Sequence, residues 1–306
     1  METRRKFRWR LPARSLALGE HTLVMGILNV TPDSFSDGGL YLETDAAVAR
    51  AIAIEAAGAD VIDIGGESTR PGSAGTSAHE EMRRILPVIE KLRGRIRIPM
   101  SVDTSKADVA EAAAAAGAEI LNDVTGLRND PRIAEVAGRR KLGLILMHLR
   151  GTPGTMQKAP FARDVMGDVT SGLRRSVALA LKMGVAKSQI VIDPGIGFGK
   201  SHEQNCRIIQ RLGEVGKIGF PVLVGTSRKS FLGAALKPDA GADRIWGTAT
   251  TVTASILQGA HIARVHDVAE MAQVARIADL VRSPKLLRDA AVLSFHKIQA
   301  GRSTSK

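Results

Sequence analysis

Polar side chains with ligand-binding chemistry stand at the ends of short apolar runs throughout this sequence. Asp103, Asn122, Asp123 and Asp193 stand at the ends of such runs. A carboxylate can accept two parallel hydrogen bonds from an amidine-like edge, in the geometry with which arginine binds a carboxylate. A single Asp in this place could also be a helix cap or a turn residue. The set favours a flat ligand rich in N–H donors, such as an aminopyrimidine ring.

Cations also gather at the ends of these runs, which predicts an anionic small-molecule ligand. They are Arg70, Lys200, Arg228, Lys229 and Arg264. Arg264 and His266 alternate in the segment RVHD and therefore share one strand face. Ser227 in SRKS precedes a predicted helix, whose free N–H groups can bind an anion; an ordinary N-cap followed by surface cations is the alternative here. Asn29 offers a neutral oxygen of the kind that Mg²⁺ accepts beside phosphates.

The segment DPGIGFGK, which begins at Asp193, differs from a phosphate-binding Walker loop. That loop needs a glycine five residues before Gly199, and Pro194 stands there instead. The segment also lacks the glycine spacing of a dinucleotide-binding turn. We expect its glycines to allow a tight bend between a strand and a helix, which brings the backbone close to a flat ligand.

The elements that must position these residues alternate along the chain. Apolar runs with polar ends occupy 24–39, 60–72, 98–106, 119–126, 142–148, 190–200, 221–230 and 261–267. Segments with helical periodicity occupy 45–57, 79–92, 106–116, 131–138, 164–183, 204–212, 243–258 and 268–281. Eight strand–helix units predict an α/β fold, a parallel sheet closed into a single (β/α)8 TIM barrel. Its active site would lie at the carboxyl ends of the strands.

Composition frames this barrel and its two ends. We expect one domain over residues 21–281, a basic, solvated tail over 1–20 and a C-terminal appendage over 282–306. The chain of 306 residues has a net charge of +12, but its 3% of aromatic residues is too few for a surface that stacks on nucleic-acid bases. The single cysteine excludes an internal disulfide and fits a reducing compartment, the cytoplasm. The sequence predicts neither a signal peptide nor a membrane span.

Several motifs in one order along residues 21–281 resemble those of the dihydropteroate synthases. They are MGILNVTPDSFSDGG, DIGGESTRPG, SVDTSK, the ND pair that starts at Asn122, MHLRGTPGTMQ, DPGIGFGK, VGTSRKS and RVHDV. The resemblance implies a pterin-binding (β/α)8 barrel, commonly a homodimer. It implies an enzyme of folate biosynthesis that joins 4-aminobenzoate to 6-hydroxymethyl-7,8-dihydropterin diphosphate, releasing diphosphate and giving 7,8-dihydropteroate.

The resemblance also implies a role for particular positions of this sequence. The residues implied to hold or contact the pterin are Asp103, Asn122, Asp193, Lys229, Met147 and Phe198. Those implied for the diphosphate are Thr69, Arg70, Arg264 and His266, with Asn29 as the ligand of Mg²⁺. Those implied to frame 4-aminobenzoate are Phe35, Pro71 and Ser227. Asp103, Asp193, Lys229 and Arg70 are the implied catalytic residues.

The chemistry of the residues agrees with this implied reaction. Departure of diphosphate leaves a methylene cation on the pterin, which a carboxylate such as Asp103 can stabilise. No arrangement of Ser/His/Asp or Cys/His indicates a covalent enzyme intermediate. Two alternatives stay open. A methyltetrahydrofolate-dependent methyltransferase would share the pterin-binding Asp and Asn, but it has no diphosphate to explain SRKS, RVHD and STRPG. A non-catalytic pterin- or nucleic-acid-binding protein would use the basic tails.

Overall fold

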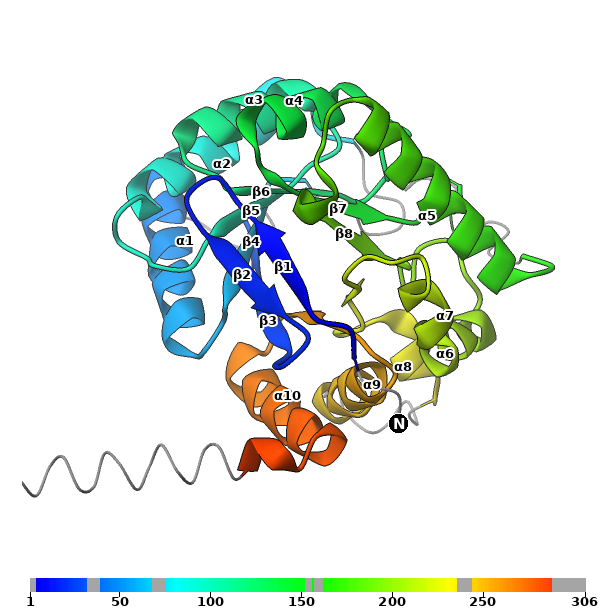
Figure 1. Cartoon of the computed structure of the whole chain (residues 1–306). Helices are drawn as coiled ribbons and strands as arrows, with labels where there is room; N and C mark the ends of the chain where they lie inside the picture. Colours follow the sequence, from blue (N-terminus) through cyan, green and yellow to red (C-terminus); the bar gives the residue numbers. More distant parts are fainter. Residues whose placement is uncertain are drawn as a thin grey trace, which may run out of the picture.

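The computed structural model describes residues 4–31, 39–67, 75–151, 156, 162–235 and 244–287. Eight parallel strands form one sheet in the order β8-β7-β6-β5-β4-β3-β10-β9. A parallel bridge between Ile192 and Val222 brings the two outer strands of this order together, so the sheet closes. The predicted (β/α)8 barrel is therefore confirmed (Figure 1).

The strands are short and almost wholly buried, as in a parallel sheet covered on both faces. Their bounds are β3 Leu23–Asn29, β4 Val61–Gly65, β5 Met100–Asp103, β6 Ile120–Asp123, β7 Gly143–Met147, β8 Ile190–Asp193, β9 Leu223–Val224 and β10 Ile262–Val265. Each lies inside one of the apolar runs in the sequence, except that β3 begins one residue before its run, at Leu23. In the sequence, each run continues past its strand into polar residues.

Helices surround the strands as an outer ring (Figure 1). Their bounds are α1 Gly39–Ala56, α2 Ala78–Leu92, α3 Ala107–Ala116, α4 Arg132–Arg140, α5 Val165–Lys182, α6 His202–Gln210, α7 Leu212–Gly216, α8 Ser230–Ala235, α9 Ile245–Leu257 and α10 Val268–Arg282. Side-chain caps fix several helix starts: Ser77 accepts from the Glu80 amide at 3.2 Å, and Asp164 accepts from the Gly167 amide at 3.0 Å. Gly117 follows α3 with φ 123°, a left-handed backbone that ends the helix there.

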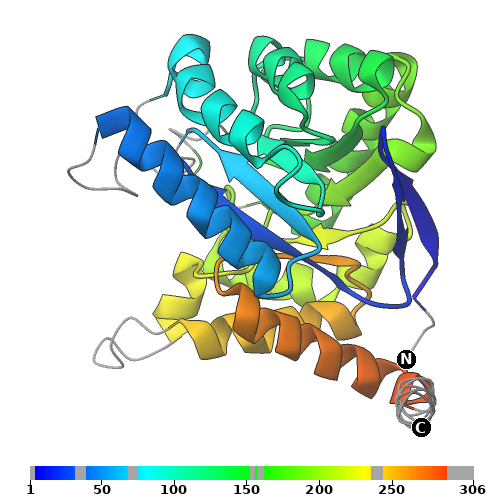
Figure 2. The same cartoon turned by 90° about the vertical axis from the view of Figure 1, so that its left-hand side faces the viewer.

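The N-terminal segment is not the solvated tail that its charge predicts. Residues 7–18 form an antiparallel hairpin of β1 (Phe7–Arg10) and β2 (Ser15–Leu18). The hairpin lies across one end of the barrel, the end that faces the viewer in Figure 1 and lies to the right in Figure 2. Trp9 is 1% exposed, and its indole N–H donates to the Gln189 carbonyl at 2.8 Å.

The N-terminal segment forms a hairpin and not a solvated tail because it covers the apolar floor of the barrel. Met25, Val61, Ile120, Ile145, Val191, Leu223 and Ile262, from the strands, form one buried cluster with Trp9, Leu11 and Leu18. Without the hairpin, the apolar side chains at this end of the barrel would meet water. The arginines of β1 alternate with its apolar residues, so charge faces outward while the hairpin covers the floor.

Arg4 also departs from the predicted tail, because its guanidinium is buried. It pairs with Asp279 of α10 at 3.0 Å and donates to the Thr22 hydroxyl at 2.7 Å. The predicted C-terminal appendage begins where α10 ends at Arg282, and residues 288–306 lie outside the described part of the chain. Among the described helices, none has the length and apolar character needed to cross a membrane.

Candidate active site at the mouth of the barrel

Strand register brings the predicted ligand-binding residues to one rim. Asn29 of β3 pairs with Gly65 of β4, Gly65 pairs with Asp103 of β5, and Asp103 pairs with Asn122 of β6. On the neighbouring strands, Met147 pairs with Asp193. Met147 and Asp193 lie two register positions beyond Ile145, the register partner of Asn122, and all of these residues lie at the carboxyl ends of the strands, opposite the end that the hairpin covers.

The ND pair at the end of β6 shows how strand alternation separates a ligand residue from a structural one. Asn122 donates its side-chain amide to Asp63 at 2.9 Å, in the network that also contains Arg264. The Asp123 carboxylate accepts from the Thr125 amide at 2.8 Å and from the Leu127 amide at 2.6 Å. The prediction that Asp123 binds the ligand together with Asn122 is therefore corrected: Asp123 holds the turn after the strand, and Asn122 is the member of the pair in the site.

Arg264 connects two carboxylates across the barrel mouth. Its guanidinium donates to Asp63 at 2.6 Å and to Asp103 at 2.9 Å. Asp63 is fully buried in the middle of β4, and one of its oxygens, Oδ1, has no hydrogen-bond partner among the described residues. Sequence reasoning missed Asp63 because it considered only the ends of the apolar runs. A lone carboxylate inside such a run is the signal that would have found it.

Burial perturbs both carboxylates predicted to hold the pterin. It raises the pKa of Asp103 above its ordinary value, although the charge of Arg264 acts in the opposite direction. It also raises the pKa of Asp193 to about 6, against the hydrogen bond from the Gly195 amide and the charge of Lys229. Charge at these two positions is therefore costly without a ligand, and a ligand that supplies N–H donors stabilises it.

Lys229 lies beside these carboxylates and over an aromatic ring. Its ammonium nitrogen is 3.9 Å from the centre of the Phe198 ring. Burial and the charge of Arg264 lower its pKa to about 8. Lys229 precedes α8 rather than lying inside it, because Arg228 adopts a left-handed backbone with φ 57° and the helix starts at Ser230. The helix that the sequence predicts after Ser227 therefore begins only at Ser230, beyond Arg228 and Lys229.

The glycines of DPGIGFGK make the bend that the sequence predicts. Gly195, Gly197 and Gly199 have φ of 68°, 85° and 69°, in the left-handed region that favours glycine. A Cβ at Gly197 would lie 2.9 Å from the side chain of Lys229. The absence of that atom lets Lys229 reach the ring of Phe198.

Ser227 and His266 contact each other at the same rim. The Ser227 oxygen is 3.0 Å from His266 Nδ1 and accepts from the His266 backbone amide at 3.2 Å. Burial and the charge of Arg264 lower the pKa of His266 to about 4. The expected cation is therefore a neutral imidazole at pH 7. If the Ser227 hydroxyl donates to Nδ1, the ring proton is on Nε2 and can be donated to a ligand.

Two of the predicted strand-end cations are committed to the protein itself. Arg228 forms an ion pair with Asp267, with its Nε at 3.1 Å. The ammonium of Lys200 donates to three backbone carbonyls. The sequence grouped these two cations with those for an anionic ligand, and in the structure their charges have these protein partners.

Of the remaining predicted residues, two make apolar contacts in the structure and four lie outside the described residues. Met147 is buried in a cluster with Val124, Leu149 and Met156, and Phe198 packs against it. This cluster gives the site an apolar wall beside its carboxylates. Phe35, Thr69, Arg70 and Pro71 lie outside the described residues. Within the described ranges, no group of three or more His, Cys, Asp or Glu could hold a metal ion.

Known proteins are similar to this chain in sequence and in fold. Residues 25–266 match the pterin-binding enzyme family. A dihydropteroate synthase from Synechocystis is 47% identical over 255 residues, which cover 83% of this chain and 88% of that one. A Yersinia pestis dihydropteroate synthase in complex with a sulfonamide drug is 40% identical with a TM-score of 0.84, covering 91% of this chain and 100% of that one. The Xanthomonas albilineans dihydropteroate synthase with 4-aminobenzoic acid is 38% identical with a TM-score of 0.84, covering 91% and 99%. The order of the motifs, the barrel and these relatives together establish that the chain belongs to the dihydropteroate synthase family of pterin-binding enzymes.

Proposed function

We propose that the mouth of this barrel joins 4-aminobenzoate to 6-hydroxymethyl-7,8-dihydropterin diphosphate, with the individual roles given below. The observation that carries the assignment of roles is the meeting of Asp103, Asn122 and Asp193 at one rim, beside Lys229 over the Phe198 ring. Carboxylates and an amide match the N–H edge of an aminopyrimidine, and the ammonium matches its oxo group. The apolar wall at Met147 matches the ring face.

The same carboxylates act when the leaving group departs. Loss of diphosphate places positive charge on the methylene carbon and the ring conjugated to it. Asp103 and Asp193, held in a buried site, favour that charge over the neutral ground state. The lone pair of the 4-aminobenzoate amine then forms the new C–N bond, the nitrogen releases one proton to water, and no covalent bond to the protein is needed.

The diphosphate of one substrate and the carboxylate of the other are proposed to contact different residues. Arg264 would exchange part of its contact with Asp103 for diphosphate oxygens, while neutral His266 would donate one hydrogen bond. Arg70 and Thr69 are proposed for the same diphosphate from outside the described residues. Ser227 would hold the carboxylate of 4-aminobenzoate by turning its hydroxyl proton from His266 Nδ1 to a carboxylate oxygen, while His266 keeps its proton on Nε2. Phe35 and Pro71 are proposed to frame that ring.

Magnesium is part of the proposal, with Asn29 as its protein ligand. The amide of Asn29 ends β3 at the rim, is exposed, and belongs to the row that contains Asp103. A hard cation held by one neutral protein oxygen suits a site in which diphosphate oxygens and water supply the other ligands. Magnesium bound there would neutralise charge on the departing diphosphate.

A homodimer and a cytoplasmic location are further proposals. Three large apolar side chains are exposed on α9 and α10, which are adjacent helices: Trp246 at 76%, Ile277 at 59% and Val281 at 56%. A second copy of the chain that covers this face would remove them from water. The single cysteine fits a reducing compartment.

Diphosphate release tests the proposed reaction directly. The wild-type protein should release diphosphate from the pterin diphosphate only when 4-aminobenzoate is present, and chelation of Mg²⁺ should abolish the release. Release that does not depend on 4-aminobenzoate would indicate a hydrolase, and no release with both substrates and Mg²⁺ would refute the assignment. A light-scattering mass of one chain would refute the dimer alone.

A further inference from the structure

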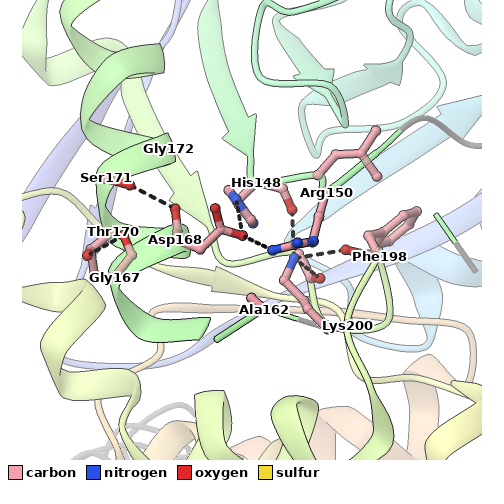
Figure 3. Close-up of polar contacts among 12 residues, drawn as sticks. His148, Arg150, Ala162, Gly167, Asp168, Thr170, Ser171, Gly172, Phe198 and Lys200 are labelled. Carbon is pink, nitrogen blue, oxygen red and sulfur yellow. Dashed lines mark hydrogen bonds and ion pairs between the residues drawn. The ribbon is translucent and has the colours of Figure 1, made fainter. Parts of the chain in front are cut away.

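Lys200 has a buried ammonium whose three protons are all used within the protein. The residue is 3% exposed. Its Nζ donates to the carbonyl oxygens of His148 at 2.9 Å, Gly195 at 2.8 Å and Phe198 at 3.0 Å (Figure 3). Only an ammonium has three protons on a point-like head, so neither arginine nor a neutral amine reproduces this contact.

The three carbonyls belong to the backbone beside three proposed pterin contacts. His148 follows Met147, at the end of β7. The Gly195 amide donates to the Asp193 carboxylate at 2.7 Å, which fixes how that side chain faces the mouth. Phe198 carries the ring under the Lys229 ammonium. One cation thus joins the segments after β7 and β8 at the points where both approach the ligand.

The segments after β7 and β8 approach each other so closely that the contact needs glycines on one side and a cation between the carbonyl oxygens. A Cβ at Gly195 would lie 2.0 Å from the His148 carbonyl oxygen, and one at Gly199 would lie 2.2 Å from that of Arg150. Carbonyl oxygens that converge on one point repel each other unless a cation lies between them. Lys200 supplies that cation.

Among the neighbouring basic side chains that the structure describes, Lys200 is the one whose positive charge lies between the three carbonyl oxygens. Burial lowers the pKa of Lys200 to about 7, and the charges of Asp193 and Asp168 oppose that effect. The three carbonyls also favour the ammonium, because a neutral amine would turn a lone pair toward one of them. Arg150 is directed to Asp168 at 3.3 Å (Figure 3). Burial lowers the pKa of His148, so its imidazole is neutral.

We propose that Lys200 is a positioning residue for the pterin: its ammonium holds Met147, Asp193 and Phe198 in their ligand-facing arrangement without touching the ligand. This inference rests on the proposed pterin site. The pterin end of the reaction should depend on Lys200, whereas 4-aminobenzoate, which is assigned to Ser227 across the mouth, should not.

The test uses Lys200→Met, which keeps the apolar stem and removes the charge, with Arg4→Met as its matched control. Arg4 is also a buried cation that donates to carbonyls, at 3.0 Å to Gly19, but it lies at the opposite end of the barrel. In Lys200→Met, KM for the pterin diphosphate and Kd for a pterin without diphosphate should both rise at least about tenfold. KM for 4-aminobenzoate should change by less than about twofold. Arg4→Met should lose thermal stability and leave all three constants within about twofold of wild type.

A second pair of variants, Lys200→Gln and Arg4→Gln, is measured in the same way. The amide of Lys200→Gln retains donors without charge, so its pterin affinity should lie between those of wild type and Lys200→Met. Unchanged pterin affinity in folded Lys200→Met, or equal rises in the KM of both substrates, would overturn the proposal. So would unfolding of both Lys200 variants while the Arg4 variants fold, because Lys200 would then support the whole fold. Failure of the wild-type protein to release diphosphate would instead refute the proposed reaction.

Discussion

Replacing Lys229 should separate stability from function in this site. The Lys229 side chain makes no hydrogen bond or ion pair among the described residues; its ammonium contacts the ring of Phe198 at 3.9 Å. Its pKa is lowered from 10.5 to about 8, mainly by burial. At about 1.4 kcal/mol per pH unit, the fold disfavours this ammonium by roughly 3 kcal/mol. The oxo group of a bound pterin would supply a hydrogen-bond acceptor for this ammonium.

The expected result for Lys229→Met follows from two opposing contributions. The variant removes the cost of the buried charge but also loses a cation–π contact of about 0.5–2 kcal/mol. At pH 7 the lysine is charged in both the folded and the unfolded chain, so the folded wild type carries the full cost. We therefore expect the variant to be about 1–2 kcal/mol more stable than wild type at pH 7, and to bind pterin at least about tenfold more weakly.

The sign of the pH dependence gives a second check. Above pH 8 the folded wild type loses the proton while the unfolded chain keeps it up to about pH 10.5, so wild-type stability gains from Lys229 as the pH rises. The stability difference between wild type and Lys229→Met should therefore shrink between pH 7 and pH 10. Urea midpoints at both pH values and pterin titrations on the same preparations measure these quantities.

Lys187→Met is the matched control for this experiment. Lys187 also lies over an aromatic ring, with its Nζ 5.4 Å from the centre of Phe220, but it is exposed and belongs to a different part of the barrel. Its replacement should change stability by less than about 0.5 kcal/mol and leave pterin binding intact. A destabilised Lys229→Met with unchanged pterin affinity would refute the reasoning, because Lys229 would then be a structural residue.

Four other outcomes can be measured with the same assays. Asp103→Asn should lower turnover at least about tenfold, since it keeps the shape of the side chain and removes its charge; wild-type rates would make Asp103 a turn residue. Arg264→Ala and His266→Ala should each raise KM for the pterin diphosphate more than KM for 4-aminobenzoate, and equal rises would place the diphosphate elsewhere. A sulfonamide should compete with 4-aminobenzoate, and noncompetitive inhibition would contradict the assigned pocket. Trp9→Ala should cost about 3–5 kcal/mol of stability while KM for both substrates stays unchanged, and a loss below about 1 kcal/mol would mean that the hairpin does not support the barrel.

The barrel was predictable because its signal is repeated. Each apolar run ends in turn and ligand-binding residues, and each helical segment after it has its own period, so a single misread element would not change the fold. Asp103, Asn122 and Asp193 were found for the same reason, since the end of a parallel strand is a defined place in space. The predicted helix at 204–212 is α6, and it ends at Gln210 before the separate α7.

The errors concern partners that lie far away in the sequence. Arg4 looks like part of a solvated tail until Asp279 is brought beside it, 275 residues later in the chain. Lys200 looks like a ligand-binding cation until the carbonyl of His148 is placed within its reach. A local pattern contains neither contact, so charge alone could not distinguish a surface cation from a buried structural one.

Asp63 shows why the charge of the site differs from the charge of the chain. The chain has a net charge of +12, yet around the pterin end of the mouth the carboxylates Asp63, Asp103 and Asp193 equal in number the cations Arg264, Lys229 and Lys200. Burial raises the pKa of Asp103 and Asp193, so a negative charge on either carboxylate is unfavourable unless a ligand stabilises it. A pterin that presents N–H donors, and then positive charge as its leaving group departs, relieves that cost most at the moment of reaction. The fold maintains this arrangement through groups that do not touch the ligand, among them Asp63, which keeps Arg264 beside Asp103.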